Sequence, residues 1–528
     1  MRCNQLPTRL MAGLMAGLAC FAALAAAPAD ANAQEDAQQM ATQVTQHGIT
    51  WTFDREHQVG QFITGDWWVV GPVTVVEVDP APGPAPDDAH IDTPENVWGD
   101  TSLRNDNRMR NGSMIVLQAG GRQGYDSRSQ TYDESLTARF PLEVDTNRSL
   151  ISTISNASLP VPNFPHKIMW DAEKQSQNVL KTAAVLTVLD EAPPDDAFRP
   201  PYAGFDKPIY RASDLQWDLL LNLDPPQVDD SAYTPAYELR VPDDWEQMER
   251  YFERPWLEHV PNWQQQQLNP NENQPNYGRE HSRLVSLASL MLLLDEPRER
   301  KEKLLIGLVQ YGIDNWGVAQ VGASWNWGGG HTSGRKWPLL LASLMLDAPE
   351  LRDVPGNVVF HEDAQTYYGT GWAGQTALYW MVQHHGRRDR YEHKHPDDWE
   401  RWDRSSESYR ICCNARAWVG TALAVRLMGQ IELWNHDAWF DYVDRWMAQE
   451  DPYAEHRGDR DRPSAEGSTF DPFVDAMWHA YRDDAPEQPM AGEPRMFVWQ
   501  NGRGRWVPNP KPTEDEVAEH LGRVQEQR

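Results

Sequence analysis

Residues 279–294 read REHSRLVSLASLMLLL, and residues 334–346 read GRKWPLLLASLML. Both contain the phrase LASLM, which begins at Leu287 in the first segment and at Leu341 in the second. Apolar residues dominate both segments, over lengths that suit buried helices better than strands. Recurrence of such a unit is typical of paired helices stacked in an array.

Further helical patterns extend this array. They cover residues 302–311, 371–385, 415–427 and 438–447. Because short loops join paired segments, we expect helix hairpins over residues 241–482, arranged as an incomplete α/α toroid.

The chain before this array has a different pattern. Short β-rich segments alternate with Pro, Gly and Asp turns over residues 48–190, which predicts an antiparallel β-rich domain. A Pro-rich linker is expected at residues 191–240, and a polar C-terminal tail at residues 483–528. The predicted fold class is therefore a multidomain α+β protein. The predicted strands lie at residues 49–53, 67–70, 73–78, 113–117, 149–154 and 183–189.

The N-terminus has the pattern of an export signal. Residues 1–33 combine two arginines with an apolar run and an Ala31-Asn32-Ala33 cleavage site, so we expect a cleavable signal peptide and a secreted or periplasmic protein. Lipid attachment at Cys20 is the alternative. Residues 34–47 are polar and Gln-rich and are expected to form a flexible leader. No other apolar stretch reaches the length of a membrane span.

The composition of the chain limits the class of molecule that it can bind. The 528 residues include 48 Lys and Arg against 78 Asp and Glu, for a formal net charge of −30. A surface this acidic repels phosphate backbones and anionic headgroups, which excludes sequence-independent binding of nucleic acid. The chain also holds 24 Trp, and Trp rings outside a core offer flat surfaces for sugars. We therefore expect a polysaccharide substrate; the oligomeric state is not indicated.

The most unusual segment joins two predicted helices. Residues 315–337 read NWGVAQVGASWNWGGGHTSGRKW, and three consecutive glycines give the backbone conformations that are closed to other residues. The alternative to a functional loop is a long connection whose Trp side chains pack between helices. We predict that this loop forms one wall of a binding cleft through Trp325, Trp327, His331, Arg335 and Lys336.

Three other groups of polar residues stand near the starts of predicted helices, where proton donors and acceptors suit catalysis. First turns of inner helices converge at one mouth of a toroid, so we expect these groups to share a cavity with the loop. Trp67 of the β-rich domain is expected to line the same cavity. For each residue, a helix-capping or surface role is the alternative. The groups are His361-Glu362-Asp363 with Tyr367, Tyr368 and Trp372; Arg279 with His281; and Asn414 with Arg416.

Several kinds of site have no signature in this sequence. The chain contains no GxGxxG fingerprint, Walker loop, HExxH or CxxC motif, and no GxSxG elbow. We predict no cofactor. A divalent metal held by His361, Glu362 and Asp363 with His281 or His331 is the alternative, although the spacing is not a recognised one.

Cys412 and Cys413 are the only cysteines after the signal segment. An adjacent pair is not a conventional disulfide framework. Two reduced, buried thiols are the simpler interpretation, and a disulfide between the two neighbours is the alternative.

The helix hairpins of residues 279–447, the Trp-rich loop and the Asn, His, Arg and Tyr positions resemble secreted α/α-toroid polysaccharide lyases. This group includes alginate, glucuronan and heparinase-type enzymes. The resemblance implies β-elimination on a polymer that contains uronic acid. It implies these roles: Arg335 and Asn414 for the uronate carboxylate, His331 as base or neutraliser, Tyr367 as base and acid, and Trp325 and Trp327 as stacking surfaces.

Two other functions remain open. A glycoside hydrolase on the same scaffold would use a carboxylate pair, drawn from Asp66, Glu280, Glu362 and Asp363. A non-catalytic glycan-binding protein would keep the Trp surfaces and have no turnover.

Overall fold

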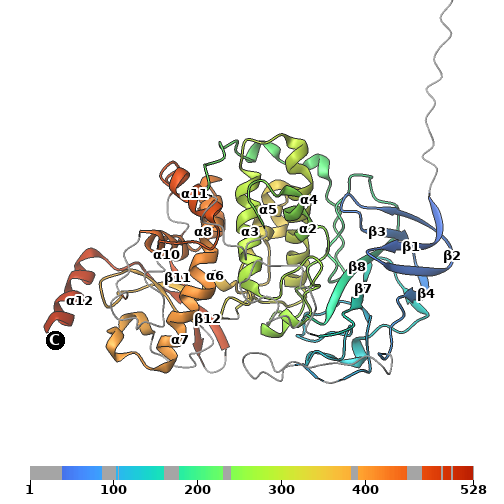
Figure 1. The fold of residues 1–528 in the computed structure, drawn as a ribbon, viewed down its shortest axis with the longest axis horizontal. Coiled ribbons are helices and arrows are strands. Elements are labelled where there is room, and N and C mark those ends of the chain that lie inside the picture. Colours follow the sequence, from blue (N-terminus) through green and yellow to red (C-terminus); the bar gives the residue numbers. More distant parts are fainter. Residues whose placement is uncertain are drawn as a thin grey trace, which may run out of the picture. The chain divides into compact units, whose positions relative to one another are not determined.

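The computed structural model describes residues 39–85, 103–104, 106–159, 178–229, 239–326, 328–381, 390–448, 453, 467–488, 492–500 and 503–526. Residues 39–528 form one compact unit, and the predicted signal peptide lies outside the described residues. This unit has an α+β fold, in which a curled β-sheet is followed along the chain by helices (Figure 1). None of the described helices is long and apolar enough to cross a membrane.

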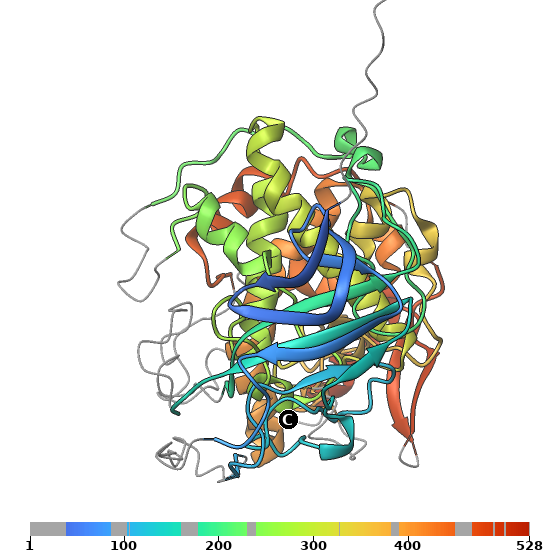
Figure 2. The same cartoon turned by 90° about the vertical axis from the view of Figure 1, so that its right-hand side faces the viewer.

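The sheet has eight strands and runs in the order β5-β7-β8-β3-β2-β4-β6, with β1 paired to β2. Figure 2 looks onto this sheet. Its neighbours are antiparallel except β3 and β8, which pair in parallel, so the prediction of a purely antiparallel domain is wrong at this point. The strands are β1 (Met40–Gln46), β2 (Ile49–Gln61), β3 (Trp67–Val70), β4 (Val73–Asp79), β5 (Ser113–Ile115), β6 (Leu142–Val144), β7 (Arg148–Ser155) and β8 (Leu180–Leu189).

All six predicted strand segments fall on strands of this sheet. Strand β1 lies within the predicted flexible leader, and the structure corrects that prediction for residues 40–46. Its residues pair with β2 from Met40 to Gln46, and Val44 is buried. The segment is polar overall, but pairing with β2 satisfies its backbone without requiring an apolar run.

Strand β8 is mostly apolar from Ala183 to Leu189 because both of its faces are covered there. Ala183 and Val185 belong to the large core that contains the helices, whereas Ala184, Leu186 and Val188 belong to a second core beneath β1–β4. Side chains alternate along a strand, so this one strand separates the two cores.

The helices pack in pairs beside the sheet. The two segments that share LASLM become α3 and α5; α3 packs against α8, and α5 packs against α4. Both faces of α3 are buried, which explains its apolar sequence. The helices are α2 (Trp245–Phe252), α3 (Gly278–Leu292), α4 (Arg298–Gln320), α5 (Lys336–Met345), α6 (His361–Gln365), α7 (Arg401–Tyr409), α8 (Ala415–Leu427), α9 (Ile431–Trp434), α10 (Asp437–Met447), α11 (Pro472–Tyr481) and α12 (Glu514–Glu526).

The helix predicted at residues 371–385 is wrong over its described part. Residues 377–379 form strand β10 (Ala377–Tyr379), which pairs antiparallel with β9 (Thr366–Tyr368). Gly374, at φ +90°, lies in the turn between the strands, a conformation that a helix does not accept. Residues 382–389 lie outside the described residues.

The C-terminal segment, predicted as a polar tail, contains regular structure. Strands β11 (Arg495–Gln500) and β12 (Arg503–Pro508) form a hairpin. Strand β11 packs against α6 and β9, where Phe497 is buried beside Tyr367 and Trp380. Arginines flank the apolar residues of both strands, and the surrounding segment is polar and Pro-rich, so the sequence did not predict this contact.

The segment predicted as a linker contributes to the core between sheet and helices. Phe198 and Tyr202 are fully buried there.

The ring of His259 lies between those of Tyr125 and Tyr202, at centroid distances of 5.7 and 5.9 Å. Burial lowers the pKa of His259 to about 3, and its ring nitrogens have no hydrogen-bond partner among the described residues. The folded protein therefore holds this imidazole neutral.

This burial predicts a loss of stability in acid. Unfolding returns His259 to a pKa near 6.5, so between pH 6.5 and 3 the unfolded state binds a proton that the folded state does not. The neutral His259 side chain therefore makes its full contribution to the free energy of unfolding above pH 6.5, and this contribution falls as the pH falls toward 3. We expect His259→Leu to lose about 2 kcal/mol less than the wild type in free energy of unfolding between pH 7.5 and 5. Urea titrations at both pH values measure this difference. The exposed control His479→Leu should match the wild type, and equal losses in all three proteins would contradict the prediction.

Candidate functional site

Four segments surround the glycine loop, which we define as residues 328–335. They are the first turn of α3, helix α6, Met381 just after strand β10, and the π-helical turn Arg410–Asn414 that precedes α8. Gly330, at φ +80°, places its backbone against this turn, where an added Cβ would lie 2.5 Å from the Cys413 oxygen. On the other side, a Cβ on Gly278 would lie 1.9 Å from the His331 oxygen. Both glycines are therefore required by close backbone approach.

His331 and Tyr277 are two of the partly exposed residues of the site. Both are half-buried, and their rings meet edge to face at a centroid distance of 4.7 Å. Burial, reinforced by His361 and Arg335, lowers the pKa of His331 to about 3. Burial also raises the pKa of Tyr277 above its usual value. At neutral pH the site thus presents a proton acceptor in contact with a proton donor.

A chain of buried polar groups lies behind this pair. His361 Nε2 lies 2.6 Å from Asn414 Oδ1, and Asn414 Nδ2 donates to the Tyr379 hydroxyl at 2.8 Å. The Tyr379 hydroxyl in turn donates to Gln365 Oε1 at 3.2 Å. His361 Nδ1 is 3.3 Å from the Thr332 hydroxyl, adjacent to His331. Asn414 is thereby fixed close to the glycine loop.

Arg335 and Lys336 do not line a cleft, contrary to the prediction. The Arg335 side chain forms an ion pair with Glu258 at 3.0 Å and donates to His281 Nδ1 at 2.6 Å. Lys336 Nζ lies 2.5 Å from Asp363. Arg335 is 0% exposed and Lys336 is 6% exposed, so both cations, and His281, are committed to the interior.

Arg279 and Arg416 lie closer to the accessible pair. Arg279 Nη1 donates to the Cys412 oxygen at 2.6 Å, and its guanidinium lies 5.5 Å from the Tyr277 ring. Both guanidiniums also lie over the ring of Phe470, at 4.8 and 4.6 Å. Of the predicted residues, Arg279, His331, Asn414 and Arg416 therefore gather around the loop.

Tyr367 and Tyr368 belong to other clusters. The Tyr367 hydroxyl is 3.2 Å from His393 Nε2, and Arg390 covers its ring at 3.9 Å. Tyr368 donates to Asp441 at 2.9 Å. In the described structure, Tyr379 of the paired strand takes the place beside Asn414 that the prediction gave to Tyr367.

The tryptophans predicted to stack on a sugar do not form one surface. Trp325 is fully buried and stacks on Phe360 at 5.6 Å, so it offers no face to a sugar. Trp372 packs against His395, and Trp67 donates to the Thr45 oxygen in the sheet. Trp327 lies outside the described residues.

The carboxylates near the loop are engaged in structural contacts. Glu362 Oε1 accepts from the Gly334 amide at 2.6 Å and from Ser333, and burial raises its pKa. Asp363 is paired with Lys336, and Glu280 with Arg279 and Arg283. Glu362 and Asp363 thus contact Gly334 and Lys336, whereas His361 contacts Asn414 and Thr332, so the three side chains do not face a common point. Within the part of the chain that the structure describes, no group of three or more His, Cys, Asp or Glu could hold a metal ion.

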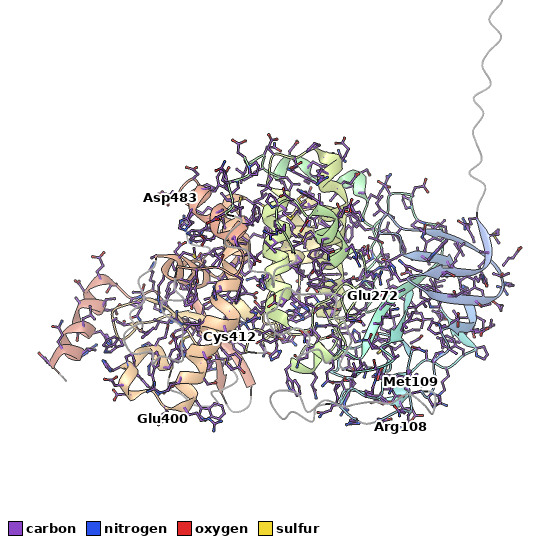
Figure 3. The ribbon with its side chains drawn as sticks, in the orientation of Figure 1. Arg108, Met109, Glu272, Glu400, Cys412 and Asp483 are labelled. Atoms are coloured by element: carbon purple, nitrogen blue, oxygen red, sulfur yellow. A yellow bond between two sulfur atoms is a disulfide. The ribbon has the colours of Figure 1, made fainter. Side chains whose placement is uncertain are left out.

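A disulfide joins Cys412 and Cys413, so of the two interpretations of these cysteines the structure contains the disulfide. Cys412, labelled in Figure 3, is half-buried, and Cys413 is buried against Gly330. The bond lies within the π-helical turn whose last residue is Asn414.

Three residues of this site had been given no role from the sequence: Tyr277, Tyr379 and Tyr409. His361 had been noted only as part of the His361-Glu362-Asp363 group. Tyr409 lies over Gly329, where an added Cβ would be 3.1 Å from its ring. Tyr277 directly precedes α3, and its neighbours Arg279 and His281 were noted instead. The side on which Tyr379 points depends on the β9–β10 hairpin, which the sequence did not predict.

Comparisons with family models, with curated proteins and with solved structures found no match to this chain.

The burial of Arg335 predicts a structural effect of its removal. Arg335→Met leaves Glu258 as an uncompensated buried charge, and we expect a loss of about 3–5 kcal/mol in free energy of unfolding. Adding Glu258→Gln to this variant should restore part of the loss. Urea titration measures both, with the exposed Arg404→Met as control. An Arg335→Met protein as stable as the wild type would mean that the guanidinium is not held in an essential ion pair.

Proposed function

We propose that the protein is a polysaccharide lyase that cleaves a uronate-containing polymer by β-elimination at the glycine loop. The observation that carries the proposal is the edge-to-face contact between the rings of His331 and Tyr277, at a centroid distance of 4.7 Å on the partly exposed side of the glycine loop. His331 is neutral at pH 7 because burial lowers its pKa. β-Elimination requires a base and an acid close to the same sugar ring.

In this mechanism the neutral His331 imidazole removes the C5 proton of the uronate. The electron pair of that C–H bond forms the C4=C5 double bond while the C4–O4 bond breaks. The Tyr277 hydroxyl then donates its proton to the departing O4. The proton left on His331 passes to solvent, which reaches its half-buried ring, and Tyr277 is reprotonated from solvent.

The C5 proton becomes acidic enough to remove only when the neighbouring carboxylate is neutralised. Both Arg335 and Arg279 are held in buried ion pairs, with Glu258 and Glu280 respectively. We assign this role to Arg279, because its guanidinium lies 5.5 Å from the Tyr277 ring. Asn414 and His361 hold the loop and the π-helical turn around the sugar. The half-buried rings of Tyr277 and Tyr409 supply the stacking surface, because Trp325 is enclosed.

The proposal includes two expectations about the whole chain. The pairing of α3 with α8 and of α4 with α5 supports an incomplete α/α toroid. The N-terminal signal pattern supports export, which would bring the enzyme to extracellular polysaccharides.

The contacts favour a lyase over a glycoside hydrolase. A hydrolase needs two carboxyl groups facing one sugar. Asp66 pairs with Arg199 and Glu280 with two arginines, while Glu362 and Asp363 are buried.

The direct experiment is incubation with alginate, glucuronan and heparan sulfate, followed by ultraviolet absorbance of the unsaturated uronate product. We expect an increase with at least one polymer. Binding without any unsaturated product would favour the glycan-binding alternative, and new reducing ends without unsaturation would favour the hydrolase.

A matched pair of tyrosine variants tests the assignment. Tyr277→Phe keeps the ring and removes the proton donor, so we expect kcat to fall by about 10²-fold or more. Tyr367→Phe, which alters the residue first predicted from the sequence, should leave kcat within a few-fold of the wild type. Steady-state rates on the best polymer measure both. The opposite ranking would move the catalytic centre to the β9 strand.

A further inference from the structure

A cavity of about 440 Å³ lies between the β2–β3 turn and the helices α2 and α4. Its lining includes residues 63–66 of the turn and one face of α4, from Glu299 through Gln310 to Asp314. None of the residues that line it belongs to the glycine loop or the π-helical turn. The cavity is within the size range of small-molecule sites.

Its floor is a buried ion triad. Arg199 pairs with Asp66 at 2.7 Å and with Asp314 at 2.6 Å. The remaining Nη1 hydrogen bonds of Arg199 go to Asp314 and to the Pro200 oxygen. Four of the five guanidinium N–H donors bond to the protein, and two carboxylates face the single positive charge. The floor therefore offers no net positive charge to a ligand.

One wall of the cavity is apolar and aromatic. Phe252 stacks on Trp256 at a centroid distance of 5.2 Å, and Tyr311 packs against Trp256 at 4.4 Å. Ile306 continues this wall along α4. Aromatic walls of this kind attract cations and methylene groups.

The rim is acidic, and its cations are already paired. Lys303 Nζ lies 3.2 Å from Glu249, and Arg254 contacts Glu253 and Glu272, the latter labelled in Figure 3. Glu299 and Glu302 also line the cavity, and neither forms an ion pair with any residue that the structure describes. They are three residues apart on α4 and thus share one side of the helix.

An unpartnered acceptor lies deeper in the same cavity lining. Gln310 is 6% exposed, and its Nε2 donates to the Arg199 oxygen at 2.9 Å. Its Oε1 has no hydrogen-bond partner among the described residues. A buried polar atom without a partner is unfavourable unless a ligand or water supplies one. The unmet capacity of the cavity thus consists of acceptors, at Gln310 inside and at two carboxylates on the rim.

We propose that this cavity binds a small organic cation, a ligand that carries a primary ammonium group at each end of an aliphatic chain. One ammonium donates to Gln310 Oε1. The second pairs with Glu302 and Glu299, which begin eight residues, or about 12 Å, farther along α4. The methylene groups between them lie along Phe252, Trp256 and Ile306. An anion is disfavoured because the carboxylates of the lining outnumber its basic residues and pair with them.

The experiment uses 1,8-diaminooctane as the probe, because its length spans the distance from Gln310 to the two carboxylates, and calorimetric titration of the full chain as the readout. We expect saturable binding at one site, and no saturable binding of the neutral isostere 1,8-octanediol. The double variant Glu299→Gln/Glu302→Gln should weaken binding by about five- to tenfold, since each exposed ion pair contributes modestly. Gln310→Met should weaken binding as well, with thermal unfolding used to verify that it folds.

Matched controls separate this site from the general acidity of the chain. Glu246→Gln removes an exposed charge on α2 outside the lining and should leave affinity unchanged. Lys303→Gln frees Glu249 and should tighten binding, whereas Lys511→Gln, with the same change of net charge, should not. Equal binding of the diol, no saturable binding of the diamine, or equal effects of Glu302→Gln and Glu246→Gln would each overturn the proposal. These readouts do not involve polysaccharide cleavage, so they stand apart from the proposed lyase activity.

Discussion

The buried ion pair between Arg335 and Glu258 is the constraint on which the glycine loop depends. A guanidinium without solvent must be neutralised by the protein, and Glu258 does so while Arg335 also contacts His281 of α3. The loop thus ends at a fixed point. Lys336 adds a second fixed point through Asp363 of α6. His331 lies only four residues before Arg335, so its contact with Tyr277 follows from these anchors.

Close backbone approach completes the positioning. Gly330 lies against Cys413, and Gly278 lies beneath the His331 carbonyl. The disulfide restricts the π-helical turn on one side of this contact, and Arg279 holds the Cys412 oxygen. The neutral histidine is therefore supported from three directions by groups that do not react, which is the arrangement expected of a pre-organised site.

The spacing of apolar residues along the sequence predicted much of the fold. It located the strands β2, β3, β4, β5, β7 and β8 and the helices α3, α5, α8 and α10, because burial leaves a periodic record in the sequence. It also drew attention to the loop that holds His331. The sequence pattern does not show which carboxylate pairs with a given cation. Glu258 is 77 residues from Arg335, so the sequence could not show that the Arg335 guanidinium is buried in an ion pair. The prediction chose Tyr367 where the structure has Tyr379, because the side chain that faces Asn414 depends on the β9–β10 hairpin. The sequence pattern did not predict this hairpin of two three-residue strands.

The two cores that meet at β8 affect how the chain can vary. Residues 197–203 run between sheet and helices, and Phe198 and Tyr202 join the same core as α3 and α4. A β-domain that ended at β8 would leave this apolar surface open to water. The sheet is therefore not a detachable module that recombination could exchange between proteins: its sequence and that of the helices must change together, through compensating substitutions across their shared core.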